Sequence, residues 1–199
     1  MINFKQYPNM TKCIIPDGTT LSSTNFSSRF SSMKNLKTVE LPNSVTNLAK
    51  AFYMCSNLTT AVCGPNVVDM YSAYSQCGRL TTAVCGPKVN NMSSAYSSCS
   101  KIQGNAYFYS NLVSNVRSCF RGRSTENRLN IYVTANSKTN STLTYYSNSI
   151  SLVGKNVAWT VDTANSCKYN TAQNIYIYYV ANVEEARIAN GDPDYMDNL

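Results

Sequence analysis

One stretch of the chain occurs twice in succession, and this internal repeat limits the possible folds more than any other feature. The segment at 51–70 reads AFYMCSNLTTAVCGPNVVDM and the segment at 73–92 reads AYSQCGRLTTAVCGPKVNNM, so the heptapeptide TTAVCGP recurs unchanged 22 residues later. A fixed period of this length is typical of a chain that stacks one small structural unit on the next. The sequence therefore predicts a repeat solenoid.

Three columns of apolar residues follow the same register in both directions along the chain. We expect them to form the continuous core of the stack, because stacking places like residues over like. The expected core residues are Phe30, Phe52, Tyr74 and Tyr96; Cys55, Cys77 and Cys99; and Leu36, Leu58, Leu80 and Ile102. The spacing stretches to 24 and 26 residues at the two ends, and the repeat covers roughly 12–133 in about six units.

Two patterns alternate within each unit. The segments at 38–41, 60–63 and 82–85 are short, rich in β-forming residues and followed by Pro or Gly-Pro, so each predicts one short strand. The apolar residues that follow are three or four positions apart, which predicts a helical or 3₁₀ return. We therefore expect an α/β repeat solenoid of 22–26-residue units, with short parallel strands and short helical returns.

The segment LPNSVTNLAKAFYMCSNLTT at 41–60 resembles the BspA-like class of leucine-rich repeat, whose units have a Pro-bounded strand followed by an AF-x-x-C-x-x-L return. The resemblance is specific at Ala51, Phe52, Cys55 and Leu58, and the chain departs from the pattern where Tyr replaces Phe in the next two units. The resemblance implies a curved solenoid that serves attachment and binding without enzymatic activity.

The repeat register fades near residue 134, which divides the chain into a solenoid at 1–133 and a β-rich C-terminal cap or subdomain at 134–199. Three β-rich runs predict strands that close the open end of the ladder, at 130–133, 157–161 and 175–180.

A short helix is expected at 183–190, near the end of the cap. Asn182 is a suitable N-cap, Glu185 stands three residues later as its capping-box partner, and Gly191 follows the last turn. The acidic residues after this helix form a tail that we expect to be exposed.

Charge and hydropathy exclude several classes of protein. Residues 1–170 carry 16 basic and 5 acidic side chains, but most of the Lys and Arg are scattered singly, so no nucleic-acid partner is expected. The N-terminus lacks the pattern of an export signal, and no later segment has the ~18 continuous apolar residues that a membrane span needs. We therefore expect neither a signal peptide nor membrane insertion.

The eight cysteines fit the repeat better than they fit a chemical site. With no export signal we expect free thiols that fill small apolar slots, although a disulfide between neighbouring coils is an open alternative. The chain has no His and no C-x-x-C motif, so neither a metal nor another cofactor is expected. It also lacks a His-dependent catalytic pair and a Gly-rich phosphate loop, so we expect no enzymatic activity.

The outward side chains of the strands are the candidate binding residues. Period-two alternation places eight of them on one face of the sheet, namely Glu40, Val62, Val84, Tyr107, Tyr109, Arg128, Asn130 and Tyr132. Such a surface suits contact with a protein or a glycan, and the alternative is that these are ordinary strand-forming residues. A basic cluster of Arg117, Arg121 and Arg123 suits a phosphate or acidic sugar, with a solvated basic loop as its alternative.

These features favour recognition over catalysis and leave three functional hypotheses. The first is a structural and attachment protein on the surface of a virion, such as a bacteriophage tail or head appendage that contacts other virion proteins. The second is the binding module of a bacterial or protist surface adhesin, as part of a larger protein. The third is an intracellular, cytoplasmic scaffold or inhibitor that binds another protein. A homo-oligomer is compatible with all three, because the edge of a solenoid can pack against a copy of itself.

Overall fold

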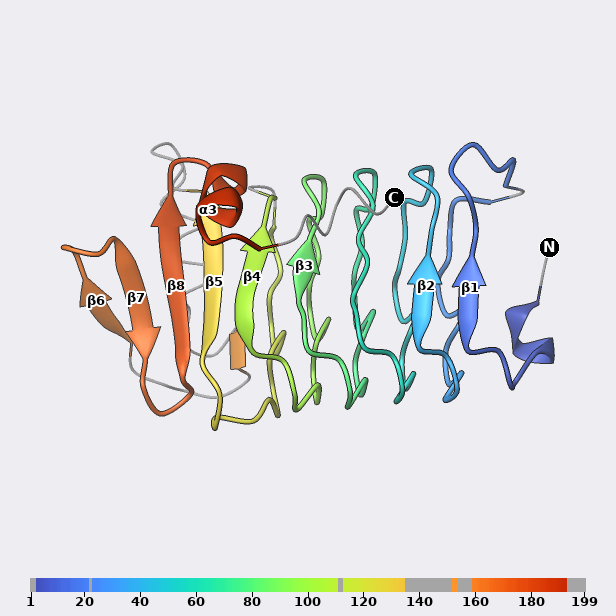
Figure 1. The fold of residues 1–199 in the computed structure, drawn as a ribbon, viewed down its shortest axis with the longest axis horizontal. Coiled ribbons are helices and arrows are strands. Elements are labelled where there is room, and N and C mark those ends of the chain that lie inside the picture. The colour runs from blue at the N-terminus through green and yellow to red at the C-terminus, as the bar shows by residue number, and fades with distance from the viewer. Residues whose placement is uncertain (1–2, 22, 111–112, 135–151, 154–158, 193–199) are drawn as a thin grey trace.

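The computed structural model describes residues 3–21, 23–110, 113–134, 152–153 and 159–192. Successive coils lie side by side along one axis, with a row of strands in front and the return segments behind it (Figure 1). In chain order the elements are η1 (Phe4–Gln6), β1 (Lys12–Ile14), β2 (Thr38–Glu40), β3 (Val84–Cys85), β4 (Gly104–Phe108), β5 (Leu129–Thr134), β6 (Thr160–Asp162), β7 (Cys167–Asn170), β8 (Ile175–Val180) and α3 (Val183–Ala189). This stacked arrangement agrees with a repeat fold.

The strands form two sheets. β1 and β2 pair in parallel, and the larger sheet has the order β3-β4-β5-β8-β7-β6. Pairing is parallel from β3 to β8, because the chain returns to the same edge before each new strand, and antiparallel from β8 through β7 to β6. The larger sheet therefore continues from β5 into β8, across the boundary that we placed at residue 134.

The return segments are series of turns, and not the helical segments that the apolar spacing predicted. In the coil at 70–77 the Ala73 amide donates to the Met70 carbonyl (3.0 Å), whereas the Ser72 amide donates to the Ser93 carbonyl of the next coil (2.9 Å). A helix would direct every amide along its own axis, so a return that bonds to its neighbour in this way cannot be helical. The third residue of two turns in each coil has the positive φ that type II turns require: Ser28, Ser32, Lys50, Met54, Ser72, Gln76, Ser94, Ser98, Ser118 and Gly122.

The three apolar columns expected from the repeat lie in the interior, where each of their side chains is at most 1% exposed. The aromatic column continues into the last coil, and neighbouring ring centroids are 5.0–5.7 Å apart through Phe30, Phe52, Tyr74, Tyr96 and Phe120. Each ring in the middle of this column is covered on both faces by rings of the adjacent coils. Repetition thus produces one core from units that could not bury their apolar faces alone.

The side chains of Tyr74 and Tyr96 extend across the interior, and their hydroxyl groups form hydrogen bonds with the main chain on the strand side. The Tyr96 hydroxyl accepts a hydrogen bond from the Val84 amide (3.0 Å) and donates one to the Val84 carbonyl (2.7 Å). The Tyr74 hydroxyl accepts from the Val62 amide (2.9 Å) and donates to the carbonyl of the same residue. Main-chain groups bound in this way are not available to a neighbouring strand. The predicted strand at 60–63 is absent, and the row divides between β2 and β3. Val84 is bound in the same way and still belongs to β3, so the tyrosine bond does not by itself exclude a strand.

Replacement of Tyr74 by phenylalanine is expected to lower the free energy of unfolding by about 1–3 kcal/mol, because the buried amide and carbonyl of Val62 lose their partner. Urea unfolding followed by circular dichroism measures the change. Tyr53→Phe is the matched control, since the Tyr53 hydroxyl bonds only at the surface, to the Gln76 amide group (2.9 Å). Equal unfolding midpoints for the two variants would contradict the structural role of the Tyr74 hydroxyl.

All eight cysteines are buried free thiols. In the main cysteine column each thiol donates to the carbonyl of an aromatic residue one coil earlier; the pairs are Cys55 to Phe30 (2.9 Å), Cys77 to Phe52 (3.0 Å) and Cys99 to Tyr74 (2.9 Å). In the second column the Cys63 sulfur accepts from the Gly86 amide (3.2 Å), and a Cβ on Gly86 would lie 2.9 Å from the Gly64 carbonyl oxygen. The Cys-Gly-Pro sequence therefore fits a close approach of two coils.

Arg123 stands in the last coil at the position that cysteines occupy in earlier coils, 24 residues after Cys99. Its side chain is buried, and its Nη groups donate to four main-chain carbonyls, those of Ile102 (3.2 Å), Asn127 (2.8 Å), Asn174 (3.1 Å) and Gln173. Burial lowers the pKa of the Arg123 guanidinium to about 10, so the group stays charged at neutral pH. One buried cation thus joins the solenoid to the turn that precedes β8.

Helix α3 lies across the front of β4 and β5 (Figure 1). Its N-cap is Asn182, whose side chain accepts from the amides of Glu184 (2.9 Å) and Glu185 (3.3 Å), as the capping pattern predicted. The chain turns away at Gly191, where φ is +68°. Helix α3 is held on the sheet through the buried residues Val183 and Arg187.

Candidate functional site

The candidate site is the outer face of the larger sheet, where the strand register aligns side chains into two rows. The first row contains Asn105, Asn130, Tyr176 and Tyr169, and the second contains Tyr107, Tyr132, Tyr178 and Cys167. Members of the two rows are two residues apart on each strand, so both rows lie on the same side of the sheet. The predicted binding residues Tyr107, Asn130 and Tyr132 therefore share this face, and Val84 extends the second row beyond Tyr107.

The part of the face over β4 is occupied by the chain itself. The Tyr107 hydroxyl donates to Asp192 Oδ2 (2.5 Å), and Asn105 Nδ2 donates to the same oxygen (2.7 Å). Burial raises the pKa of the Tyr107 hydroxyl, and the Asp192 carboxylate raises it further. Tyr107 and its row neighbour Val84 are each 1% exposed, so the prediction that these two side chains are open to a ligand is wrong for this structure. The cover comes from residues about 85 positions later, which the strand pattern alone does not reveal.

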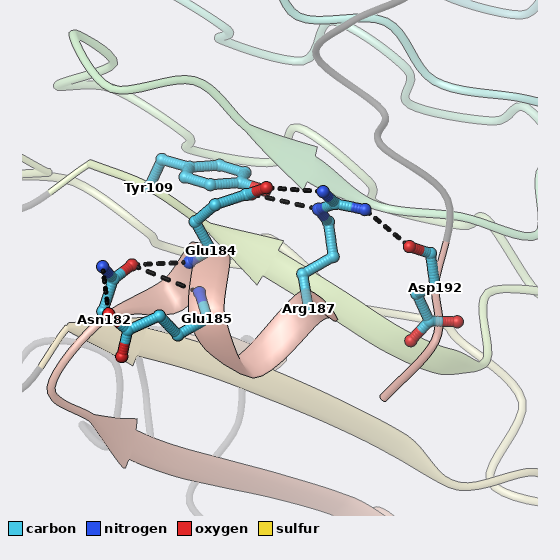
Figure 2. Close-up of polar contacts among 6 residues, drawn as sticks. All are labelled: Tyr109, Asn182, Glu184, Glu185, Arg187 and Asp192. Atoms are coloured by element: carbon cyan, nitrogen blue, oxygen red, sulfur yellow. Dashed lines mark hydrogen bonds and ion pairs between the residues drawn. The ribbon is translucent and has the colours of Figure 1, made fainter. Parts of the chain in front are cut away.

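A chain of polar contacts fixes α3 on this face (Figure 2). Tyr109 donates to Glu184 Oε2 (2.8 Å), and Arg187 pairs with both Glu184 carboxylate oxygens through Nε (3.0 Å) and Nη2 (2.5 Å). Arg187 Nη1 also donates to the Asp192 carbonyl (2.6 Å). The hydrogen bonds from Arg187 and Tyr109 lower the pKa of the Glu184 carboxyl. The predicted binding residue Tyr109 is thus engaged within the molecule.

Arg128 is exposed and Asn130 and Tyr132 are half-buried, and the half-buried Tyr176 and Tyr178 of β8 extend their surface. The Arg128 guanidinium lies over the Tyr176 ring, with Cζ 3.5 Å from the centroid. Its Nε donates to Asn130 Oδ1 (2.7 Å) and its Nη2 donates to the Tyr178 hydroxyl. The Tyr132 and Tyr178 rings stack with centroids 5.1 Å apart. These contacts hold a cation, an amide and tyrosine rings in one array.

An open pocket of about 550 Å³ adjoins this array over β7, and Arg128, Asp162, Asn165, Cys167, Tyr169 and Tyr178 are among the residues that line it. The Asp162 carboxylate accepts hydrogen bonds from the Asn165 side chain (2.8 Å) and amide (3.1 Å). These bonds lower the pKa of Asp162, which is therefore ionised at neutral pH. The pocket contains one cationic and one anionic side chain beside aromatic rings, a combination that suits a small polar ligand.

The other predicted site residues do not join this surface. Glu40 lies at the other end of the molecule, in β2, and pairs with Lys12 (3.7 Å) at the surface. Val62 packs partly buried against the core. Arg117 and Arg121 are exposed on the last return, whereas Arg123 is buried and bound to carbonyls, so the three arginines do not form one basic surface.

The site residues that were missed from the sequence include Asp162, Cys167, Tyr169, Tyr176 and Tyr178. The alternation NIYIYYV at 174–180 did predict a strand, and its two outward tyrosines were the available signal. The pairing of that strand with β5 was not predictable, because the sequence between them is long and has no repeat register. Strand β7 reads CKYN, which is too polar to stand out from the loops around it.

Comparison with protein-family models matches residues 2–127 to six copies of the BspA type leucine rich repeat region. This match covers more than half of the 199 residues. The chain belongs to the BspA-type leucine-rich repeat family. Searches of curated proteins and of solved structures returned no significant match.

The family assignment makes this BspA-type chain a repeat-based binding protein. Its matched repeats end just before Arg128, so the accessible tyrosine array and the pocket are built by residues beyond them. Among the described residues of this BspA-type protein, no helix has the length and apolar character needed to cross a bilayer.

Proposed function

We propose that this protein is a non-enzymatic recognition protein that attaches to a cell-surface protein or glycan through the outer face of β5, β8 and β7. The observation that carries the proposal is the accessible array of Arg128, Asn130, Tyr132, Tyr176 and Tyr178, in which each member contacts another. Tyrosine supplies contact area at a low cost in side-chain entropy, and Arg and Tyr are enriched where proteins bind partners.

The rigidity of the array supports a binding role. Its strands extend a ladder whose core is one continuous column of stacked rings, so the array rests on packed coils and not on a loop. A side chain that is already fixed before binding loses less entropy when the ligand arrives. The repeats, in this proposal, are the support, and β5 together with the strands of the cap provides the contact surface.

We further propose that the protein acts at the surface of a virion, such as a bacteriophage tail or head appendage, where it contacts other virion proteins and the host. Its eight buried free thiols support folding in a reducing compartment, as expected for a particle assembled inside a cell. Detection of the chain by mass spectrometry in purified particles would support this location. Its recovery as part of a larger cell-surface protein would instead favour an adhesin module.

Loss of cell binding on changing the array tests the attachment function. We expect Arg128→Ala and Tyr132→Ala each to weaken binding of the labelled full chain to candidate host cells at least about five-fold, because each removes a contact group of about 1–2 kcal/mol or more. Flow cytometry over a concentration series gives the apparent Kd. Tyr71→Ala is the matched control, because Tyr71 is a surface tyrosine of the returns that is 40% exposed. Equal losses in all three variants, or no loss in the first two, would contradict the proposed face.

A further inference from the structure

The pocket over β7 arises from a change of side-chain size along one row of the sheet. Tyr107, Tyr132 and Tyr178 follow one another in the second row, with ring centroids 5.1 Å apart at both steps. The next position in the row is Cys167, which lies opposite Tyr178 in the β7–β8 register. Because a thiol is much smaller than a phenol, the row ends in a hollow above the Cys167 side chain. Tyr132 covers one face of the Tyr178 ring, so the other face points toward this hollow.

The far side of the hollow is polar. Asp162 of β6 lies opposite Cys167 in the antiparallel register, and Asn165 binds its carboxylate from the turn between these strands. The Arg128 guanidinium lines the same pocket. The hollow therefore combines one aromatic face, one carboxylate acceptor and one guanidinium donor.

The charges identify the kind of ligand that this combination fits. Asp162 and Arg128 carry opposite charges, so the pocket supplies no net charge for an anion such as a phosphate. The ring of a neutral sugar has an apolar C–H face that packs on an aromatic ring, and its hydroxyl groups both donate and accept hydrogen bonds. A carboxylate accepts from such hydroxyls and a guanidinium donates to them. The pocket volume of about 550 Å³ lies within the range of ligand sites in proteins.

We propose that the hollow between Tyr178 and Asp162, with Cys167 as its floor, binds one monosaccharide unit of a neutral glycan. The inference builds on the proposed attachment function and names the class of ligand. The sugar ring packs on the Tyr178 ring, its hydroxyls donate to Asp162, and Arg128 donates to a ring or hydroxyl oxygen. The buried Cys167 thiol takes no chemical part, because burial raises its pKa and keeps it protonated.

Saturation-transfer NMR on the full chain tests the inference with defined probes. The neutral probes are the methyl glycosides of glucose, galactose, mannose and N-acetylglucosamine, and the anionic probes are N-acetylneuraminic acid and inorganic phosphate. We expect at least one neutral glycoside to bind with a Kd of roughly 1 mM, because a single monosaccharide makes few contacts. We expect the protein to show no preference for the anionic probes. Titration of the responding glycoside gives its Kd for each variant.

Two variants locate the binding. Cys167→Leu fills the hollow and is expected to weaken binding at least ten-fold. Asp162→Asn keeps the shape of the side chain and one of its two acceptor oxygens for Asn165 but removes the charge. It is expected to weaken binding about ten-fold even if Cys167→Leu fails to fold. Val161→Thr is the matched control, because Val161 precedes Asp162 on β6, points to the opposite side and is 58% exposed.

The outcomes separate this inference from the attachment function. Cell binding that persists in Cys167→Leu and Asp162→Asn, without a signal from any neutral glycoside, overturns the sugar site and leaves attachment standing. A preference for the anionic probes, or equal glycoside binding by Asp162→Asn and wild type, also overturns it. If the wild-type protein binds a neutral glycoside, both variants lose that binding, and the wild type binds no cell, the result supports the sugar site and overturns attachment.

Discussion

Replacement of Arg123 by methionine is expected to lower the free energy of unfolding by about 3–5 kcal/mol. The substitution leaves buried main-chain carbonyls on both sides of the junction without a donor, and each such loss costs about 1–3 kcal/mol. Urea denaturation at pH 7 measures the effect as a shift of the unfolding midpoint. Because the carbonyls belong to the solenoid and to the turn before β8, we also expect the cap to unfold before the repeats in this variant.

Arg121→Met is the matched control for that experiment. Arg121 lies two residues earlier on the same return, but it is exposed, so its replacement should change stability by less than about 0.5 kcal/mol. If Arg123→Met were as stable as Arg121→Met, the guanidinium would not hold the junction together.

Alkaline pH is expected to destabilise the protein steeply. Burial raises the pKa of the Cys55 and Cys63 thiols from 9.0 to about 12. Below pH 9 both thiols are protonated in the folded and unfolded states, and their contribution to stability is fully present. Between pH 9 and 12 the unfolded chain releases protons that the folded chain retains, so the free energy of unfolding falls by about 1.4 kcal/mol per pH unit for each thiol. Burial also raises the pKa of the Tyr74 and Tyr96 hydroxyls, which steepens the loss above pH 10.

Unfolding midpoints in urea at pH 8, 9.5 and 10.5, under reducing conditions, measure this dependence. Cys63→Ala is the control, because removing one thiol should reduce the slope by about 1.4 kcal/mol per pH unit whatever its effect at pH 8. A free energy of unfolding that does not change from pH 8 to 10.5 would show that these thiols titrate normally in the folded chain.

The repeat fold was predictable because its evidence is local and recurs. Phe52 and Cys55 have counterparts one coil later at the same positions, and a shared period is sufficient to place them in common columns. The helical returns were predicted wrongly because apolar spacing reports which side chains face inward, but not whether an amide bonds within its own coil or to the next one. That choice depends on residues with positive φ, such as Ser72, whose identity gives little warning of it.

The candidate site was less predictable, because its decisive contacts join distant parts of the sequence. The outward direction of Asn130 and Tyr132 follows from strand alternation alone. The cover over Tyr107 depends on Asp192, and the hollow depends on the pairing of β7 with β8. Neither contact can be predicted from the residues adjacent in sequence. For Arg123 a signal did exist, since the 24-residue spacing of the last unit places it in the cysteine column.

Alternate amides of the returns donate from each coil to the carbonyls of the coil that follows, as the Ser72 amide does to the Ser93 carbonyl. The junctions between the central coils, which have the 22-residue spacing, therefore share one hydrogen-bond pattern, as Lys50 to Tyr71 and Ser72 to Ser93 show. Recombination between the two copies of TTAVCGP would add or delete one whole coil without breaking a turn or exposing the core. Each added coil would move the tyrosine array about 4.8 Å farther from the N-terminal end. The same contact surface would then lie at a different distance from the N-terminal end.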